Sequence, residues 1–216
     1  MGWLDEPALC WAAGFGNKAI VDRFADECDI DSPFLRAAMG DLSYLEAWAA
    51  ARNDPATATD ESGFNLLFYC AKSRQGIDDE ASRTSLEAVA QWLLDHGVDP
   101  GHTLERELPI SAPFLCASSG INLGVMTALL TASAVTNQDF QLVIQHTLEP
   151  HQRSGEPAYA IADAVLAHGL DINAINPKQR RTRLHGSANR GTLKAVQWLL
   201  DNGADPYALD ESGPTW

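Results

Sequence analysis

The 216-residue sequence has few basic residues, no long apolar run and no paired cysteines. No stretch approaches the roughly 18 apolar residues that identify a membrane-spanning helix, so no membrane segment is expected. The amino terminus has no basic start followed by an apolar run, which predicts no signal peptide. The four cysteines are widely spaced, as expected of reduced, mostly buried thiols in a cytoplasmic protein: Cys10, Cys28, Cys70 and Cys116.

The sequence also lacks the common catalytic motifs. It has no Gly-x-Ser-x-Gly elbow, no phosphate-binding glycine loop and no His-Glu-x-x-His helix. His146 and His151 are five residues apart, which is not the spacing of a helical metal pair. The acidic residues 78–80 lack the alternating pattern of a calcium loop, and we interpret them as a solvated loop. We therefore predict no catalytic residues, no cofactor, no metal and a function other than catalysis.

Acidic residues outnumber basic residues by 29 to 15, which gives a formal net charge of -14. Residues 1–60 hold 11 acidic and 4 basic residues, whereas residues 131–216 hold 9 and 7, so the acidity is concentrated early in the chain. Such a field repels phosphate backbones and anionic lipids, so we expect no nucleic-acid and no membrane partner. It attracts a basic protein, although solubility alone also explains it.

One internal repetition is visible in the sequence. Residues 92–100 read Trp-Leu-Leu-Asp-His-Gly-Val-Asp-Pro, and residues 198–206 read Trp-Leu-Leu-Asp-Asn-Gly-Ala-Asp-Pro. The two segments are 106 residues apart, which is three units of about 35 residues. A period of this length is typical of repeat proteins, in which stacked neighbours jointly bury the apolar faces that one unit cannot bury alone.

The last complete unit predicts two short helices. Gly191 and Gly203 stand where the first and the second helix should end. The second helix has apolar residues at helical spacing, which predicts one buried face: Leu193, Val196, Leu199 and Leu200.

These segments resemble the ankyrin repeat family. Residues 182–185, Thr-Arg-Leu-His, match the family's Thr-Pro-Leu-His start, with Arg183 in place of proline, and residues 203–205 match its Gly-Ala-Asp finish. The resemblance implies an all-α ankyrin-repeat solenoid of stacked helix-turn-helix units with short β-turn fingers. It implies one domain over residues 1–216, in about six repeats and a partial cap at 210–216. The approximate repeats are 5–31, 32–59, 60–102, 103–138, 139–174 and 175–209.

Two repeats depart from the pattern. The fifth rests on spacing, with helices expected over Phe140–Thr147 and Pro157–His168. The third contains an insertion around Ser73–Thr84, which we interpret as a tolerated surface loop, with a functional loop as the alternative. His185 occupies the family's structural histidine position, so the resemblance implies a hydrogen-bonding role rather than catalysis.

Ankyrin proteins bind through their fingers and the first helix of each repeat. Applied to the positions that match the pattern, the resemblance implies contacts with a partner at Trp11, Phe15, Glu61, Ser62, Phe64, Tyr69, Lys72, Lys178, Gln179, Arg181, Asn189 and Arg190. The last finger is basic in an otherwise acidic chain, because five of the seven basic residues after position 130 lie in or near it. Contact with a partner and pairing with the chain's own acidic fingers are both open explanations.

We expect a protein-binding module that is a monomer when free. The sharper hypothesis is a bacterial immunity or antitoxin-like protein that masks a basic effector, because the chain is small, acidic and made of repeats throughout. The alternative is an adaptor or scaffold subunit in a regulatory or host-directed complex.

Overall fold

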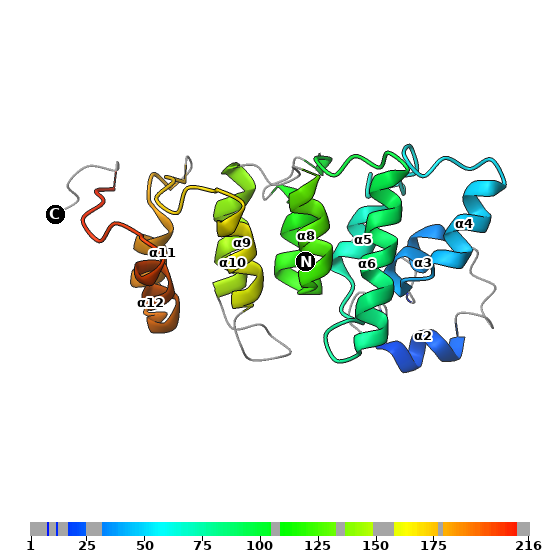
Figure 1. Ribbon diagram of the computed structural model, residues 1–216, viewed down its shortest axis with the longest axis horizontal. Helices are drawn as coiled ribbons and strands as arrows, with labels where there is room; N and C mark the ends of the chain where they lie inside the picture. Colours follow the sequence, from blue (N-terminus) through cyan, green and yellow to red (C-terminus); the bar gives the residue numbers. More distant parts are fainter. Residues whose placement is uncertain are drawn as a thin grey trace. The chain divides into compact units, whose positions relative to one another are not determined.

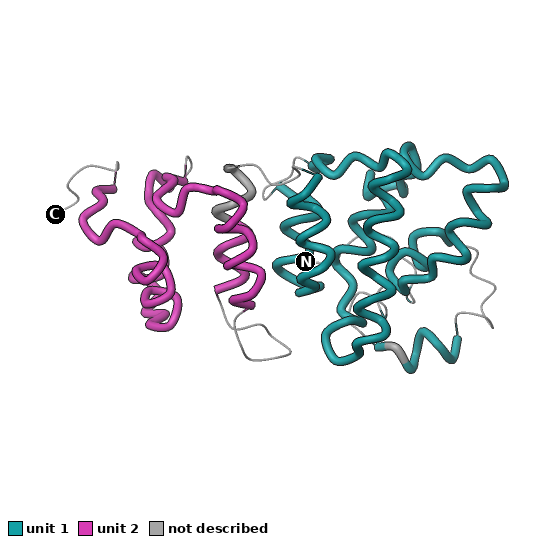
Figure 2. The backbone as a smooth tube through the Cα atoms, viewed as in Figure 1, with its two compact units in different colours: residues 1–134 teal, residues 135–216 magenta. Residues whose placement is uncertain are grey.

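The structure is a computed structural model, and it describes Ala8, Ala12 and residues 17–24, 32–104, 109–132, 137–148, 158–176 and 179–210. The chain divides into two compact units, residues 1–134 and residues 135–216 (Figure 2). Helices dominate both units, which confirms the all-α class expected from the sequence.

The described residues of the first unit form most of the helices, and Figure 1 labels all of these except α7 and η1. They are α2 (Lys18–Phe24), α3 (Pro33–Met39), α4 (Leu42–Ala50), α5 (Leu66–Lys72), α6 (Glu80–Asp95), α7 (Ala112–Leu115), the π-helical turn η1 (Cys116–Gly120) and α8 (Leu123–Thr131). The strands β1 (Thr103–Leu104) and β2 (Ile110–Ser111) pair antiparallel before α7.

Side-chain caps explain where six of these helices begin. In each case a polar side chain accepts a hydrogen bond from the backbone N–H three residues further on, which satisfies one of the free donors at a helix start. The capping residues of α3 to α8 are Ser32, Asp41, Asn65, Asp79, Ser111 and Asn122.

Helices of the first unit pack in two rows. The helix α5 contacts both α3 and α7, and α6 contacts both α4 and α8. Hydrogen bonds join neighbours across the first row, since Ser73 Oγ donates to the Ala38 carbonyl over 2.6 Å and Ser119 Oγ donates to the Lys72 carbonyl over 2.8 Å. The core between the helices is apolar and fully buried, and includes Leu35, Leu45, Leu66, Leu67, Phe68, Leu86, Leu93, Met126 and Leu129.

Only part of the insertion expected in the third repeat forms a loop, and the rest is helical. The connection between α5 and α6 spans residues 73–79, and the rest of the insertion extends α6 to 16 residues. Ser73 and Gln75 are buried in this connection, and Asp79 caps α6. The segment is therefore largely packed, with exposed acidic side chains at Asp78 and Glu80.

The described residues of the second unit form two helix pairs. They are α9 (Asn137–Leu148) with α10 (Tyr159–Ala167), and α11 (Arg183–Arg190) with α12 (Leu193–Asp201). The first pair lies within two or three residues of the helices expected at 140–147 and 157–168. The apolar face predicted for α12 is partly wrong, because Leu199 is fully buried but Leu193 is 78% and Leu200 38% exposed.

Candidate functional site

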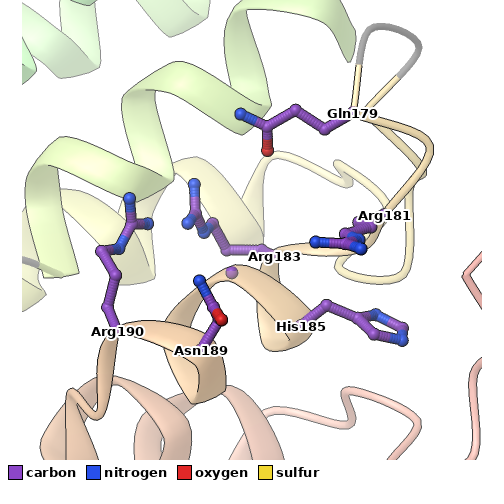
Figure 3. Close-up of a pocket in the computed structure, with 7 residues that line it drawn as sticks. Gln179, Arg181, Arg183, His185, Asn189 and Arg190 are labelled. Carbon is purple, nitrogen blue, oxygen red and sulfur yellow. The ribbon is translucent and has the colours of Figure 1, made fainter. Parts of the chain in front are cut away.

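A polar pocket of about 380 Å³ lies in the second unit (Figure 3). Its lining comes from the turn before α11 and from α11 itself: Gln179, Arg181, Arg183, His185, Gly186, Asn189 and Arg190. Three of these residues are arginines, in a chain whose formal net charge is -14. The pocket is thus a local concentration of positive charge on an acidic protein.

Helical spacing explains why the residues of α11 meet at one pocket. Arg183, Gly186 and Arg190 are three and four residues apart, so they share one face of the helix. The turn that supplies Gln179 and Arg181 is held by an antiparallel bridge between Asn176 and Arg181. Figure 3 shows Gln179, Arg183 and Arg190 pointing into one space, with the ring of His185 turned away from it.

Arg183 is the buried member of the group, at 5% exposure. Its Nη1 donates to Gln145 Oε1 of α9 over 2.8 Å, and its Nε has no hydrogen-bond partner. Gly186 makes room for this side chain, because a Cβ at that position would lie 2.3 Å from Arg183 Nη2. The guanidinium therefore lies across α11 at Gly186, and a side chain there would make the end of Arg183 shift.

Two of the other polar residues of the pocket, Arg181 and His185, have partners within the second unit. Arg181 Nε donates to Asp210 Oδ2 over 3.1 Å, an exposed ion pair that matches the alternative of pairing within the chain. His185 Nδ1 is hydrogen-bonded to Thr182 Oγ1 at 2.8 Å. This contact fits the structural role that the sequence suggests for the histidine.

The structure gathers four of the expected contact residues at this pocket: Gln179, Arg181, Asn189 and Arg190. Lys178, Trp11 and Phe15 lie outside the described residues. Arg183 and Gly186 were not among the expected contacts. Their spacing with Arg190 was visible in the sequence, but the link to Gln145 was not, because it joins helices 38 residues apart.

The remaining expected contact residues lie in the first unit, and two of them are corrected by their burial. Phe64 and Tyr69 are part of the core, where Tyr69 also packs against Phe34 with ring centroids 5.2 Å apart. Glu61 is exposed and Ser62 is half-buried. Lys72 Nζ lies 4.3 Å from the centroid of the Tyr69 ring, a cation–π contact that covers one face of the ring.

Two buried thiols lie in the core of the first unit. Cys70 and Cys116 are free cysteines, and their Sγ atoms donate to the carbonyls of Leu86 and Asn122 over 3.2 and 3.3 Å. Burial raises the pKa of Cys116 to about 12 and raises the pKa of Cys70 further, with the neighbouring Cys116 adding to the shift at Cys70. These thiols are therefore neutral and unsuited to nucleophilic chemistry.

The described residues contain neither a metal-binding cluster nor a membrane-spanning helix. Among them, no group of three or more His, Cys, Asp and Glu side chains is placed to hold a metal ion. No helix in the same residues has the length and apolar character that crossing a membrane requires.

No protein-family model matches the chain, and no curated protein matches it at a significant level.

Proposed function

We propose that the chain is an ankyrin-repeat solenoid that binds another protein. The observation that carries this proposal is the recurrence of the same helix endings. After α3 and after α11 a glycine with positive φ, Gly40 at 74° and Gly191 at 70°, donates to the carbonyl three residues back. The next residue, Asp41 or Thr192, then donates to the carbonyl five residues back. These are the bonds of a Schellman ending, repeated at equivalent places in both units.

The helices α6 and α12, each the second helix of a proposed repeat, also share one type of ending. Gly97 and Gly203 follow α6 and α12 with φ of 80° and 91°, and the buried residues Val98 and Ala204 donate back to the carbonyls of Leu93 and Leu199. The aspartates that come next, Asp99 and Asp205, each accept a hydrogen bond from the N–H two residues on, over 2.8 Å. One repeating unit explains why separate segments reuse the same local chemistry.

Short antiparallel contacts precede α5, α7 and α11, each the first helix of a proposed repeat. The β-turn fingers of such repeats require contacts of this kind. Thr59 bridges Asn65 before α5, β1 pairs with β2 before α7, and Asn176 bridges Arg181 before α11. Fingers of this kind leave side chains free to contact a partner, because the tight turn needs only local bonds. A stack of such units offers an extended surface, which supports protein binding by a cytoplasmic monomer as the function.

Two kinds of partner remain, each favoured by a different feature. The first unit exposes acidic side chains, including Glu46, Glu61 and Asp95, which favours an immunity or antitoxin-like protein that masks a basic effector. The arginine-lined pocket of the second unit favours an adaptor that holds an acidic partner.

Capture of partners from a lysate of the source cells, followed by titration of each purified candidate, tests this function. A basic effector should bind the full chain less tightly as the salt concentration rises. It should also bind a Glu46→Gln, Glu61→Gln double variant less tightly than the wild type. An acidic partner should be insensitive to those two changes. If no purified candidate binds the purified chain directly, the protein-binding proposal fails.

A further inference from the structure

Arg183 is a buried charge without a counterion in the described part of the chain. Its guanidinium has five N–H groups, and the bond to Gln145 Oε1 engages a neutral acceptor. Its Nε is buried and unpaired although Arg183 is only 5% exposed. Proteins rarely bury a charge in this way unless an ion pair compensates the loss of hydration. An anion that enters the open pocket beside Arg183 would supply this compensation.

Gly186 is a second, independent sign that the site is built for the guanidinium. Glycine within a helix is unfavourable because of its backbone entropy, and α11 contains one in its middle turn. Its φ is not in the left-handed region, so the helix does not need glycine for its conformation. What it does provide is clearance, since a Cβ would make Arg183 Nη2 move from its present position.

We propose that this pocket binds an acidic peptide segment of a partner protein, with one carboxylate seated on Arg183. The planar fork of the guanidinium can donate two parallel hydrogen bonds to a carboxylate. Arg190 adds a second guanidinium to the lining, and Arg181 adds a third that is paired with Asp210 at the edge of the pocket. Gln179 and Asn189 have amide groups that both donate and accept, which suits a peptide backbone better than a bare anion.

The size of the pocket agrees with a peptide rather than a single ion. Its volume of about 380 Å³ is at the small end of the range for ligand sites. This leaves room for a glutamate or aspartate side chain together with adjoining backbone. The inference rests on the proposed protein-binding function and names the chemistry of the segment that is bound.

Isothermal titration of the full chain with three probes tests the chemistry: hexaglutamate, hexaglutamine and inorganic phosphate. Hexaglutamate should bind, with an affinity that falls as the salt concentration rises, and hexaglutamine should not bind. If phosphate binds and hexaglutamate does not, the pocket is a phosphate site and the carboxylate proposal is overturned.

Two variants locate the binding at Arg183 by different means. Arg183→Gln removes the charge, and Gly186→Ala keeps the charge but displaces the guanidinium. Each should weaken hexaglutamate at least about 30-fold, as for loss of one partner from a buried charge pair. Lys194→Gln, an exposed position of α12 outside the pocket, makes the same charge change as Arg183→Gln and should alter the affinity less than about twofold.

Thermal unfolding of the same proteins separates binding from folding. Both pocket variants should keep or raise the melting temperature, because one removes an unpaired buried charge and the other replaces glycine in a helix. Loss of hexaglutamate binding together with a native melting temperature supports the pocket. Equal loss in all three variants overturns it, because the interaction would then be a general charge effect.

The partner captured from lysate distinguishes the two proposals. If it binds the wild-type chain and Arg183→Gln equally, protein binding stands and the pocket proposal is overturned. If hexaglutamate binds through Arg183 but no purified protein binds the chain, the pocket stands and the proposed function fails.

Discussion

Leu199 and Leu200 are neighbours in the chain but lie on different sides of α12. Leu199 is fully buried, whereas Leu200 keeps 38% of its surface exposed. One residue corresponds to about 100° of rotation around a helix, so adjacent leucines cannot both face the same core directly.

The two leucines should respond differently to truncation. Leu199→Ala should lower the free energy of unfolding by about 2–5 kcal/mol, because it leaves a cavity in the core. Leu200→Ala should cost only about 0.5–1 kcal/mol, since part of its surface is already in water. Urea unfolding of both variants measures the difference, and equal losses would contradict the orientation of α12.

Gly40 and Gly191 offer a matched test of the helix endings. Both have a left-handed backbone, so an alanine at either position should cost about 1–2 kcal/mol. A Cβ at Gly191 would meet no atom within 4 Å, whereas a Cβ at Gly40 would lie 2.9 Å from Ser85 Cβ and 3.1 Å from Leu86 N. Gly40→Ala should therefore lose about 1–3 kcal/mol more than Gly191→Ala through overpacking. A larger loss at Gly191, measured by urea unfolding, would argue against the packing of α3 on α6.

Tyr69 should affect stability more than binding. Its hydroxyl donates to Asp60 Oδ2 over 2.6 Å, and Asp60 Oδ1 also accepts from the N–H groups of Ser62 and Phe64. Tyr69→Phe removes one hydrogen bond to a charged acceptor and should cost about 1.5–3 kcal/mol in urea unfolding. Partner affinity measured well below the melting temperature should stay unchanged. A selective loss of affinity with full stability would instead return Tyr69 to the contact surface.

The buried thiols predict a fall in stability at high pH. The folded state holds the protons of Cys70 and Cys116 to higher pH than the unfolded state does, because burial raises both pKa values. The free energy of unfolding should therefore be unaffected by these thiols below their ordinary pKa of 9.0 and fall as the pH rises from there toward about 12. The slope should approach about 1.4 kcal/mol per pH unit for each thiol.

A Cys70→Ala, Cys116→Ala variant is the control for other groups that titrate in this range, such as tyrosine and lysine. Urea unfolding from about pH 8 to about pH 10 should show a shallower decline for the variant than for the wild type. Iodoacetamide labelling of the native chain, mapped by mass spectrometry, provides a second readout. Rapid labelling of Cys70 or Cys116 at neutral pH would contradict their burial.

Much of the fold could be predicted from the sequence because its determinants are local. The glycines at positions 191 and 203 end helices, as glycine stop signals after a run of helical spacing predict. The helices expected at 140–147 and 157–168 were located by their spacing from the other segments, and α9 and α10 lie there. The spacing of apolar residues predicts which of them share one face of a helix, but not which part of that face another helix covers. The sequence therefore did not predict that Leu193 is exposed.

The parts that could not be predicted depend on contacts between distant segments. The sequence resemblance places Phe64 and Tyr69 on a finger and a helix surface, but packing in the first unit buries them. In the sequence, Arg183 takes the place of the proline in the Thr-Pro-Leu-His motif that residues 182–185 resemble. Its burial depends on the clearance at Gly186 and on Gln145, and neither relationship follows from helical spacing alone.

The clearance at Gly186 has a consequence for protein engineering. A library of this chain selected only for heat resistance should accumulate alanine at position 186 and uncharged residues at position 183, because both changes favour the folded helix. The selected variants would be more stable, but they would lack the arginine arrangement that lines the pocket. Screening for thermostability and screening for retained ligand would thus enrich opposite sequences at these two positions.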